Sequence, residues 1–280
     1  MKKILFMFAA ALMMVACSNE EIVTNDDVQY VSELKLNFGK GDSRVTATHD
    51  PASGLKFAWE DGDRIHISLN EENKSLSFYY KYDASSRTFK PENESYKMEA
   101  GKSYFAVMRS NSVCNVTNNG TADVQVGLNL DNNISMKQLP LISDVFIADA
   151  SGTIATMHHL VGMVEIPVKL GNTATYTTVE KFTLYASGGK LADSFTAKPM
   201  SPYIKDTSTG YDTAYENEGP YTLSTSSTTT VFIPVLPGTY NNLKLNYFYG
   251  ESSSKQVSLG NITVERGKIT KIAETTVNPN

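Results

Sequence analysis

The sequence predicts an all-β protein of two tandem β-sandwich domains. Two observations predict this class: apolar and polar residues alternate along many short segments, and turn-forming residues separate those segments. Alternating strands have one wet and one dry face, which is typical of antiparallel sheets packed as a sandwich. The 15 Tyr and 12 Phe suit such pleated surfaces.

The strands are expected where the alternation is clearest, at residues 34–38, 65–69, 124–130, 164–170 and 243–247. Turn residues lie between them, at 61–63, 118–120, 187–189, 237–238 and 266–267. Pro167 interrupts the fourth segment, and because proline has no N–H to donate, it predicts an edge strand. Residues 201–230 are poor in aliphatic side chains and predict a long surface loop, a place for recognition.

The domain boundary is expected near residue 156. A length of 280 residues accommodates two domains of ordinary size. Residues 144–156 contain the turn-like Asp149-Ala150-Ser151-Gly152, and a fresh run of strands follows. The sequence therefore predicts an N-terminal domain at 45–156 and a C-terminal domain at 157–280, after a signal at 1–16 and a tether at 17–44.

Composition argues against several functions. There are 25 Lys and Arg against 30 Asp and Glu, a net charge of -5, so the chain is poorly suited to nucleic acid. Two Cys and four His offer neither a disulfide scaffold nor a zinc site, and we expect no metal and no cofactor. No Gly-x-Ser-x-Gly motif is present, so no catalytic residue is predicted.

The N-terminus predicts export. Lys2 and Lys3 precede an apolar run that is too short to span a membrane, which is typical of a secretory signal. Met14-Val15-Ala16-Cys17 resembles the bacterial lipobox, which implies that Cys17 carries the lipid; the alternative is a signal peptide that happens to contain a Cys. The acidic residues that follow resemble a signal for the outer face of the outer membrane, although an ordinary solvated tether fits them nearly as well.

Three further segments carry a family resemblance: residues 57–67 (FAWEDGDRIHI), 157–166 (MHHLVGMVEI) and 232–240 (FIPVLPGTY). In this order and spacing they resemble the fimbrillin family, the pilus subunits and relatives of Bacteroidales. The resemblance implies two sandwich domains of transthyretin-like topology, a cell-surface location and no catalysis. The residues themselves predict structural roles: Trp59 as a core wedge, and Asp61 and Asp63 as acceptors for turn amides.

The resemblance also implies a maturation step. A protease cuts after an Arg near the N-terminus, a first strand leaves with its lipid, and a strand of another pilus subunit fills the groove. Here the residues that match are Leu34, Leu36 and Phe38 as the removable strand and Arg44-Val45 as the cleaved bond. Arg44 as an ordinary solvated loop residue is the alternative.

Three further features of the sequence yield predictions. Only a short tail follows the last predicted strand at 269–272, whereas stalk subunits of the family carry a long C-terminal appendage, so a tip or accessory subunit is favoured. Asp212-Thr213-Ala214 matches a loose O-glycosylation pattern, which makes Thr213 a weak candidate. Adjacent His158 and His159 predict one packed and one solvated histidine rather than a ligand pair.

The second hypothesis is a surface glycan-binding lipoprotein that keeps its lipid tether. Exposed aromatic rings would stack on sugars in such a protein, and four tyrosines crowd the predicted loop; ordinary packing explains them equally well. These are Tyr203, Tyr211, Tyr215 and Tyr221. An enzyme is the third hypothesis, with no recognisable motif in its favour.

Overall fold

A computed structural model describes residues 28–38, 48–50, 54–56, 59–71, 76–108, 116–118, 124–127, 139–192, 194–207, 212–215 and 219–280. The regular elements of these ranges are strands, so the all-β prediction is confirmed. In the same ranges, no helix has the length and apolarity needed to cross a membrane. The tandem sandwich arrangement and its transthyretin-like topology stay predictions.

Eight strands of the N-terminal half form one sheet that closes on itself, because β12 pairs with β9 as well as with β14. Closure leaves few free edges and encloses one apolar core. In sheet order the strands are β12 (Leu141–Ser143), β14 (Thr153–His159), β2 (Leu34–Phe38), β7 (Thr88–Pro91), β6 (Ser77–Asp83), β5 (Arg64–Leu69), β9 (Ser103–Met108) and β13 (Phe146–Ile147).

Two four-stranded sheets make up most of the C-terminal half, and their buried side chains share one core. The first contains β22 (Thr229–Val235), β15 (Gly162–Leu170), β25 (Ile269–Lys271) and β26 (Thr275–Val277). The second, in order, contains β20 (Thr213–Tyr215), β17 (Lys181–Tyr185), β23 (Gly238–Tyr249) and β24 (Ser253–Val264). The segments predicted at 164–170 and 243–247 lie within β15 and β23.

Pro167 does not lie in an edge strand, so that prediction is wrong. Strand β15 pairs with β22 on one side and with both β25 and β26 on the other. The register with β25 covers residues 163–165 and the register with β26 covers residues 168–170. Pro167 therefore lies at the break between the two short strands, where a central strand tolerates a missing N–H.

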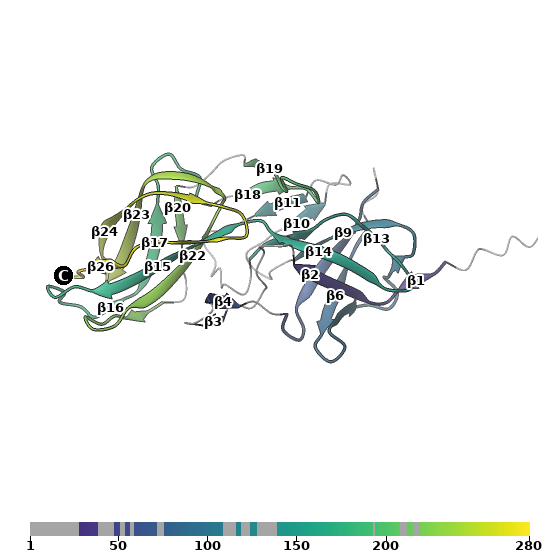
Figure 1. Ribbon diagram of the computed structural model, residues 1–280, viewed down its shortest axis with the longest axis horizontal. Coiled ribbons are helices and arrows are strands. Elements are labelled where there is room, and N and C mark those ends of the chain that lie inside the picture. The colour runs from purple at the N-terminus through teal and green to yellow at the C-terminus, as the bar shows by residue number, and fades with distance from the viewer. Residues whose placement is uncertain are drawn as a thin grey trace, which may run out of the picture.

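A smaller sheet joins the two halves. Strands from far apart in the chain pair in it, and Figure 1 shows it between the eight-stranded sheet and the C-terminal sheets. Its order is β10 (Val116–Asn118), β11 (Val124–Gly127), β18 (Ser194–Ala197) and β19 (Ile204–Thr207). A second apolar cluster lies at this junction and includes Phe105, Leu160 and Phe232. The predicted boundary at residue 156 stays a prediction; β14 runs across it.

The region predicted as one long loop, residues 201–230, contains β19, β20 and β21, so it contributes strands to three sheets. Polar strands of this kind lack the aliphatic alternation that predicts a strand from sequence. Three two-stranded sheets complete the described elements: β1 (Tyr30–Val31) with β8 (Met98–Glu99), β3 (Thr48–Asp50) with β4 (Gly54–Lys56), and β16 (Thr178–Val179) with β21 (Tyr221–Thr222).

Candidate strand-release site

Strand β2 lies inside the eight-stranded sheet, not at its margin. It pairs in parallel with β14, from Leu34 opposite Thr153 to Phe38 opposite Met157. On its other side it pairs with the antiparallel β7, where Leu34 lies opposite Phe89. If β2 left, the closed sheet would have a gap bordered by β14 and β7.

The inward face of β2 is apolar. Leu34 is fully buried in the core, and Leu36 and Phe38 are half-buried against the same core. Lys35 and Asn37, which alternate with them, are exposed. The structure thus places all three residues of the predicted stripe on one face, while the release of the strand stays a prediction.

Trp59, the only Trp of the chain, covers the end of this strand. Its ring centroid lies 5.3 Å from that of Phe38 and 4.8 Å from that of Phe89, with an edge-on geometry to the latter. Phe38 also stacks on His159 at 6.4 Å. Trp59 is half-buried and packs on the core as predicted, at the point where β2 meets its neighbours.

Asp61 and Asp63 accept hydrogen bonds from turn amides, as predicted, Asp63 within the turn after Trp59 and Asp61 from the neighbouring β6–β7 turn. Gly62 has a φ of +93°, which a residue with a side chain rarely adopts. Asp63 Oδ2 accepts a hydrogen bond from the Glu60 amide at 2.8 Å, and Asp61 Oδ1 accepts one from the Ala84 amide at 3.1 Å. These carboxylates satisfy turn amides, and in the described residues no cluster of His, Cys, Asp or Glu could hold a metal ion.

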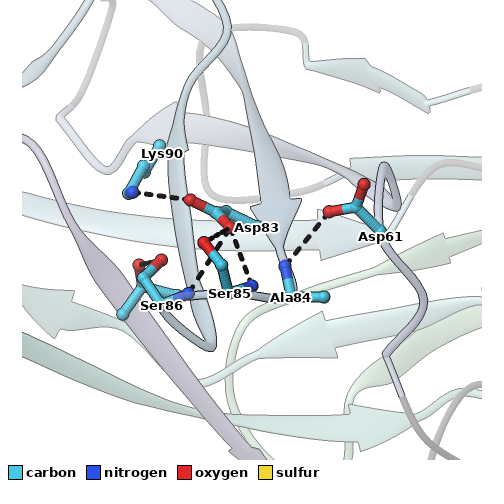
Figure 2. A network of polar contacts seen from close by, with 7 residues as sticks. Asp61, Asp83, Ala84, Ser85, Ser86 and Lys90 are labelled. Carbon is cyan, nitrogen blue, oxygen red and sulfur yellow. Dashed lines mark hydrogen bonds and ion pairs between the residues drawn. The ribbon is translucent and has the colours of Figure 1, made fainter.

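A third aspartate, Asp83, fixes the hairpin that carries β7. Figure 2 shows Asp83 between the Lys90 ammonium, 2.6 Å from Oδ2, and the amides of Ser85 and Ser86. The Lys90 contact, and after it the hydrogen bonds from Ser85, hold the pKa of the Asp83 carboxyl well below its usual range. The β6–β7 turn is therefore stabilised by contacts that do not involve β2.

The junction between the halves is a polar and aromatic cluster that the sequence did not predict. His159 is buried as expected, but His158 is not solvated: its ring stacks on Tyr203 at 4.5 Å, and its Nε2 lies 3.0 Å from Asp144 Oδ2. Tyr203 also donates to Asp144 Oδ1 at 2.7 Å, and the Arg266 guanidinium lies 4.6 Å from the Tyr203 ring centroid. The prediction that one of the two histidines is solvated is wrong, because the Tyr203 ring from the C-terminal half covers His158.

Two of the four tyrosines of the glycan hypothesis, Tyr203 and Tyr221, are packing residues. Tyr203 is buried at the junction, and Tyr221 packs on Phe182 with 5.4 Å between ring centroids. Tyr211 and the side chain of Tyr215 lie outside the described residues. Both described rings therefore take part in packing, and Tyr221 is half-buried.

Several predicted positions are not tested by the structure. Cys17, Arg44 and Val45 lie outside the described residues. Thr213 begins β20, where it is half-buried and donates to Asp212 Oδ1 at 3.2 Å. Lipidation, cleavage and O-glycosylation at these residues therefore stay predictions.

Comparison with known proteins shows the fold. No protein-family model and no curated protein sequence matches the chain. A crystal structure of a candidate cell adhesion protein of Bacteroides ovatus matches 89% of this chain and 93% of its own, with a TM-score of 0.57 and 12% identity. A second, from Bacteroides uniformis, covers 88% of this chain and 93% of its own, with a TM-score of 0.54 and 11% identity. At 11–12% identity, these structural neighbours show that the chain shares their fold.

Proposed function

We propose that this protein is a surface-exposed fimbrial subunit or adhesin, in a tip or accessory position rather than in the main stalk. Before maturation a lipid on Cys17 holds it at the outer membrane. Cleavage after Arg44 separates β2 from the rest of the chain, and a strand from another pilus subunit takes its place. The position of β2, an apolar strand near the N-terminus and inside the closed sheet, is the observation that carries this proposal.

Loss of β2 would leave a groove that favours another strand. Full burial of a Leu or Phe side chain contributes about 1.5–3 kcal/mol, so Leu34 and the half-buried Leu36 and Phe38 together contribute about 3–6 kcal/mol. The backbone of β14 and β7 would also lose its partners, and unpaired strand edges are templates for a new strand. Burial of apolar side chains and pairing of the free strand edges both favour addition of a new strand over closure of the gap.

The walls of that groove have support of their own. On its far side β14 pairs with β12, from His159 opposite Leu141 to Met157 opposite Ser143. Strand β7 pairs with β6 along its length, and the Asp83 network fixes their turn. This arrangement supports a groove that keeps its shape long enough to accept a donor.

The C-terminal segment supports a tip or accessory position. Strand β26 is bound within its own sheet, where Val277 is fully buried. Beyond it, Tyr249 donates to the Asn280 carbonyl at 2.8 Å, and the Pro279 carbonyl accepts from the Thr175 amide at 2.8 Å. Residues 275–280 are thus paired and hydrogen-bonded within this chain, which supports a role for them other than that of a donor strand.

The first test is the intact mass and N-terminal sequence of the protein released from cells. We expect an N-terminus at Val45 in the wild type and in a Lys40→Ala control, and its loss in Arg44→Ala. A lipidated Cys17 terminus in all three proteins would refute maturation at Arg44. The second test uses Trp59: its emission should shift to longer wavelength in the matured chain, and a synthetic peptide of residues 28–38, added at about millimolar concentration, should reverse part of the shift.

A surface glycan-binding lipoprotein is the second candidate function. An open pocket with tyrosine rings in the N-terminal half favours it. The two functions differ in their tether, because a lipid-anchored glycan binder retains residues 17–44 and a matured pilus subunit loses them.

A further inference from the structure

A pocket opens on the outer face of the eight-stranded sheet. It lies where β6 begins and where the chain turns between β7 and β8, and its volume is about 260 Å³. Because ligand sites of whole drug-sized molecules occupy about 300–1,000 Å³, this pocket has room for one small ring. Its lining residues are Ser77, Phe78, Tyr79, Glu92, Asn93 and Tyr96.

The ring of Tyr79 is held in position by two residues of the neighbouring strand β5. Phe78 and Tyr80 point into the core, so the alternation of β6 places Tyr79 on the outer face. The Arg64 guanidinium lies 4.5 Å from the Tyr79 ring centroid, and the His66 ring centroid lies 5.1 Å from it. Arg64 also forms an ion pair with Glu92, so one guanidinium fixes two residues of the pocket.

The opposite wall is a tight turn that presents Tyr96 to solvent. The Tyr96 amide donates to the Asn93 carbonyl, and the Ser95 amide donates to Asn93 Oδ1, both at 2.9 Å. These bonds fix the backbone below Tyr96, whose side chain is nevertheless 54% exposed. An exposed aromatic ring on a fixed backbone loses little entropy on binding, which suits a recognition contact.

The polar groups of the pocket match hydroxyls and not a charged group. The carboxylate oxygens of Glu92 accept hydrogen bonds from hydroxyl groups. Asn93 Oδ1 already accepts a hydrogen bond from the Ser95 amide, so Asn93 offers a ligand its Nδ2 amide group as a donor. The charge of Glu92 is balanced by Arg64, and Glu94 beside it is balanced by Lys97. The described residues that line the pocket include no Lys or Arg, so a phosphate or a carboxylate on the ligand would meet the Glu92 carboxylate, and the pocket favours a neutral ligand.

From these features we infer that the pocket binds one neutral pyranose unit of an extracellular glycan. A pyranose combines an apolar C–H face, which packs on the exposed ring of Tyr96, with hydroxyls that reach Glu92 and Asn93. The inference rests on the proposed surface role, since only there does the pocket face such glycans, and it names the class of ligand that the adhesin would hold. The sequence alone did not indicate it, because residues 77–79 and 92–96 come together only in the fold.

The test measures binding of four methyl pyranosides, those of glucose, galactose, mannose and N-acetylglucosamine, to the purified uncleaved protein by saturation-transfer NMR. A ligand of about twelve non-hydrogen atoms reaches a Kd of about a millimolar at ordinary ligand efficiency. We expect this affinity for at least one glycoside, and a loss of about tenfold or more in Tyr96→Ala. Tyr176→Ala removes a tyrosine that is 48% exposed in the C-terminal half, and it should bind as the wild type does.

Unchanged thermal unfolding of Tyr96→Ala, followed by Trp59 emission, would show that the variant is folded. Absence of transfer to all four glycosides, or equal affinity of Tyr96→Ala and wild type, would refute the inference. This test is independent of the test of the proposed function, because sugar binding is measured on the uncleaved protein. Sugar binding with a retained Cys17 terminus would sustain the pocket and refute the pilus mechanism, and the reverse result would refute the pocket alone.

Discussion

Replacing Leu34 by alanine removes the most deeply buried side chain of β2. Leu34 is 0% exposed and lies between β14 and β7, opposite Thr153 and Phe89. Leu→Ala changes in cores cost about 2–5 kcal/mol, and the cost is larger where the surroundings cannot collapse into the cavity. Because the closed sheet supports this site on both sides, we expect a loss of about 3–4 kcal/mol, against a total stability of about 5–15 kcal/mol for an ordinary domain.

Unfolding in guanidinium chloride, followed by Trp59 emission, measures this loss. Trp59 contacts both Phe38 and Phe89, so its emission reports on the N-terminal half and not on the C-terminal sheets. Lys35→Ala is the matched control, since Lys35 lies in the same strand with its side chain exposed. A surface change of this kind is expected to stay within about 0.5 kcal/mol.

A loss below about 1 kcal/mol in Leu34→Ala would refute the reasoning, because it lies below the range of buried Leu→Ala changes. An equal loss in Lys35→Ala would refute it as well, since the effect would then come from the backbone of β2 and not from the buried face. Either result would also weaken the proposal that this strand is what a donor must replace.

Three other predictions concern the rest of the fold. Burial raises the pKa of Tyr80 from 10.0 to about 12. The stability that this residue contributes is therefore complete below pH 10, and the free energy of unfolding should fall between pH 10 and 12. Denaturant titrations at these pH values should show a smaller fall in Tyr80→Phe. Tyr203→Ala removes the ring that stacks on His158, and calorimetry should then resolve separate unfolding transitions for the two halves. Gly162→Ala would place a Cβ 2.5 Å from the Glu265 carbonyl oxygen and should cost about 1–3 kcal/mol, measured by thermal unfolding followed by near-ultraviolet circular dichroism.

Many of the strands were predictable because apolar and polar residues alternate along them. The segments at 34–38, 65–69 and 164–170 each place apolar side chains at every second residue, and each lies in a strand with that face inward. The pairing of β2 with β14 was not predictable, since it brings residues 34–38 beside 153–157 and depends on the whole sheet. Pro167 was misplaced for the same reason, because its tolerance depends on where β25 ends and β26 begins.

The residues of the candidate site also differ in whether the sequence alone could identify them. The apolar stripe of β2 is a property of five consecutive residues and could be found from the sequence alone. The cluster of His158, Tyr203 and Arg266 joins positions from three distant segments, and no local pattern marks it. One local pattern in the sequence indicates that Tyr96 is exposed: it directly follows the polar, turn-forming residues Asn93-Glu94-Ser95.

The anchoring of residues 28–38 bears on what cleavage after Arg44 would do. Besides the β2 stripe, Val31 is buried, and its carbonyl accepts a hydrogen bond from Tyr80 at 2.6 Å. Two fully buried and two half-buried side chains contribute about 5–9 kcal/mol while the segment is part of the chain. Once cleaved, the segment must also overcome an association cost of about 4–15 kcal/mol, so its net affinity becomes marginal. Cleavage would therefore suffice to make β2 exchangeable without a separate energy source, and a donor strand that buries more apolar surface in the same groove would displace it.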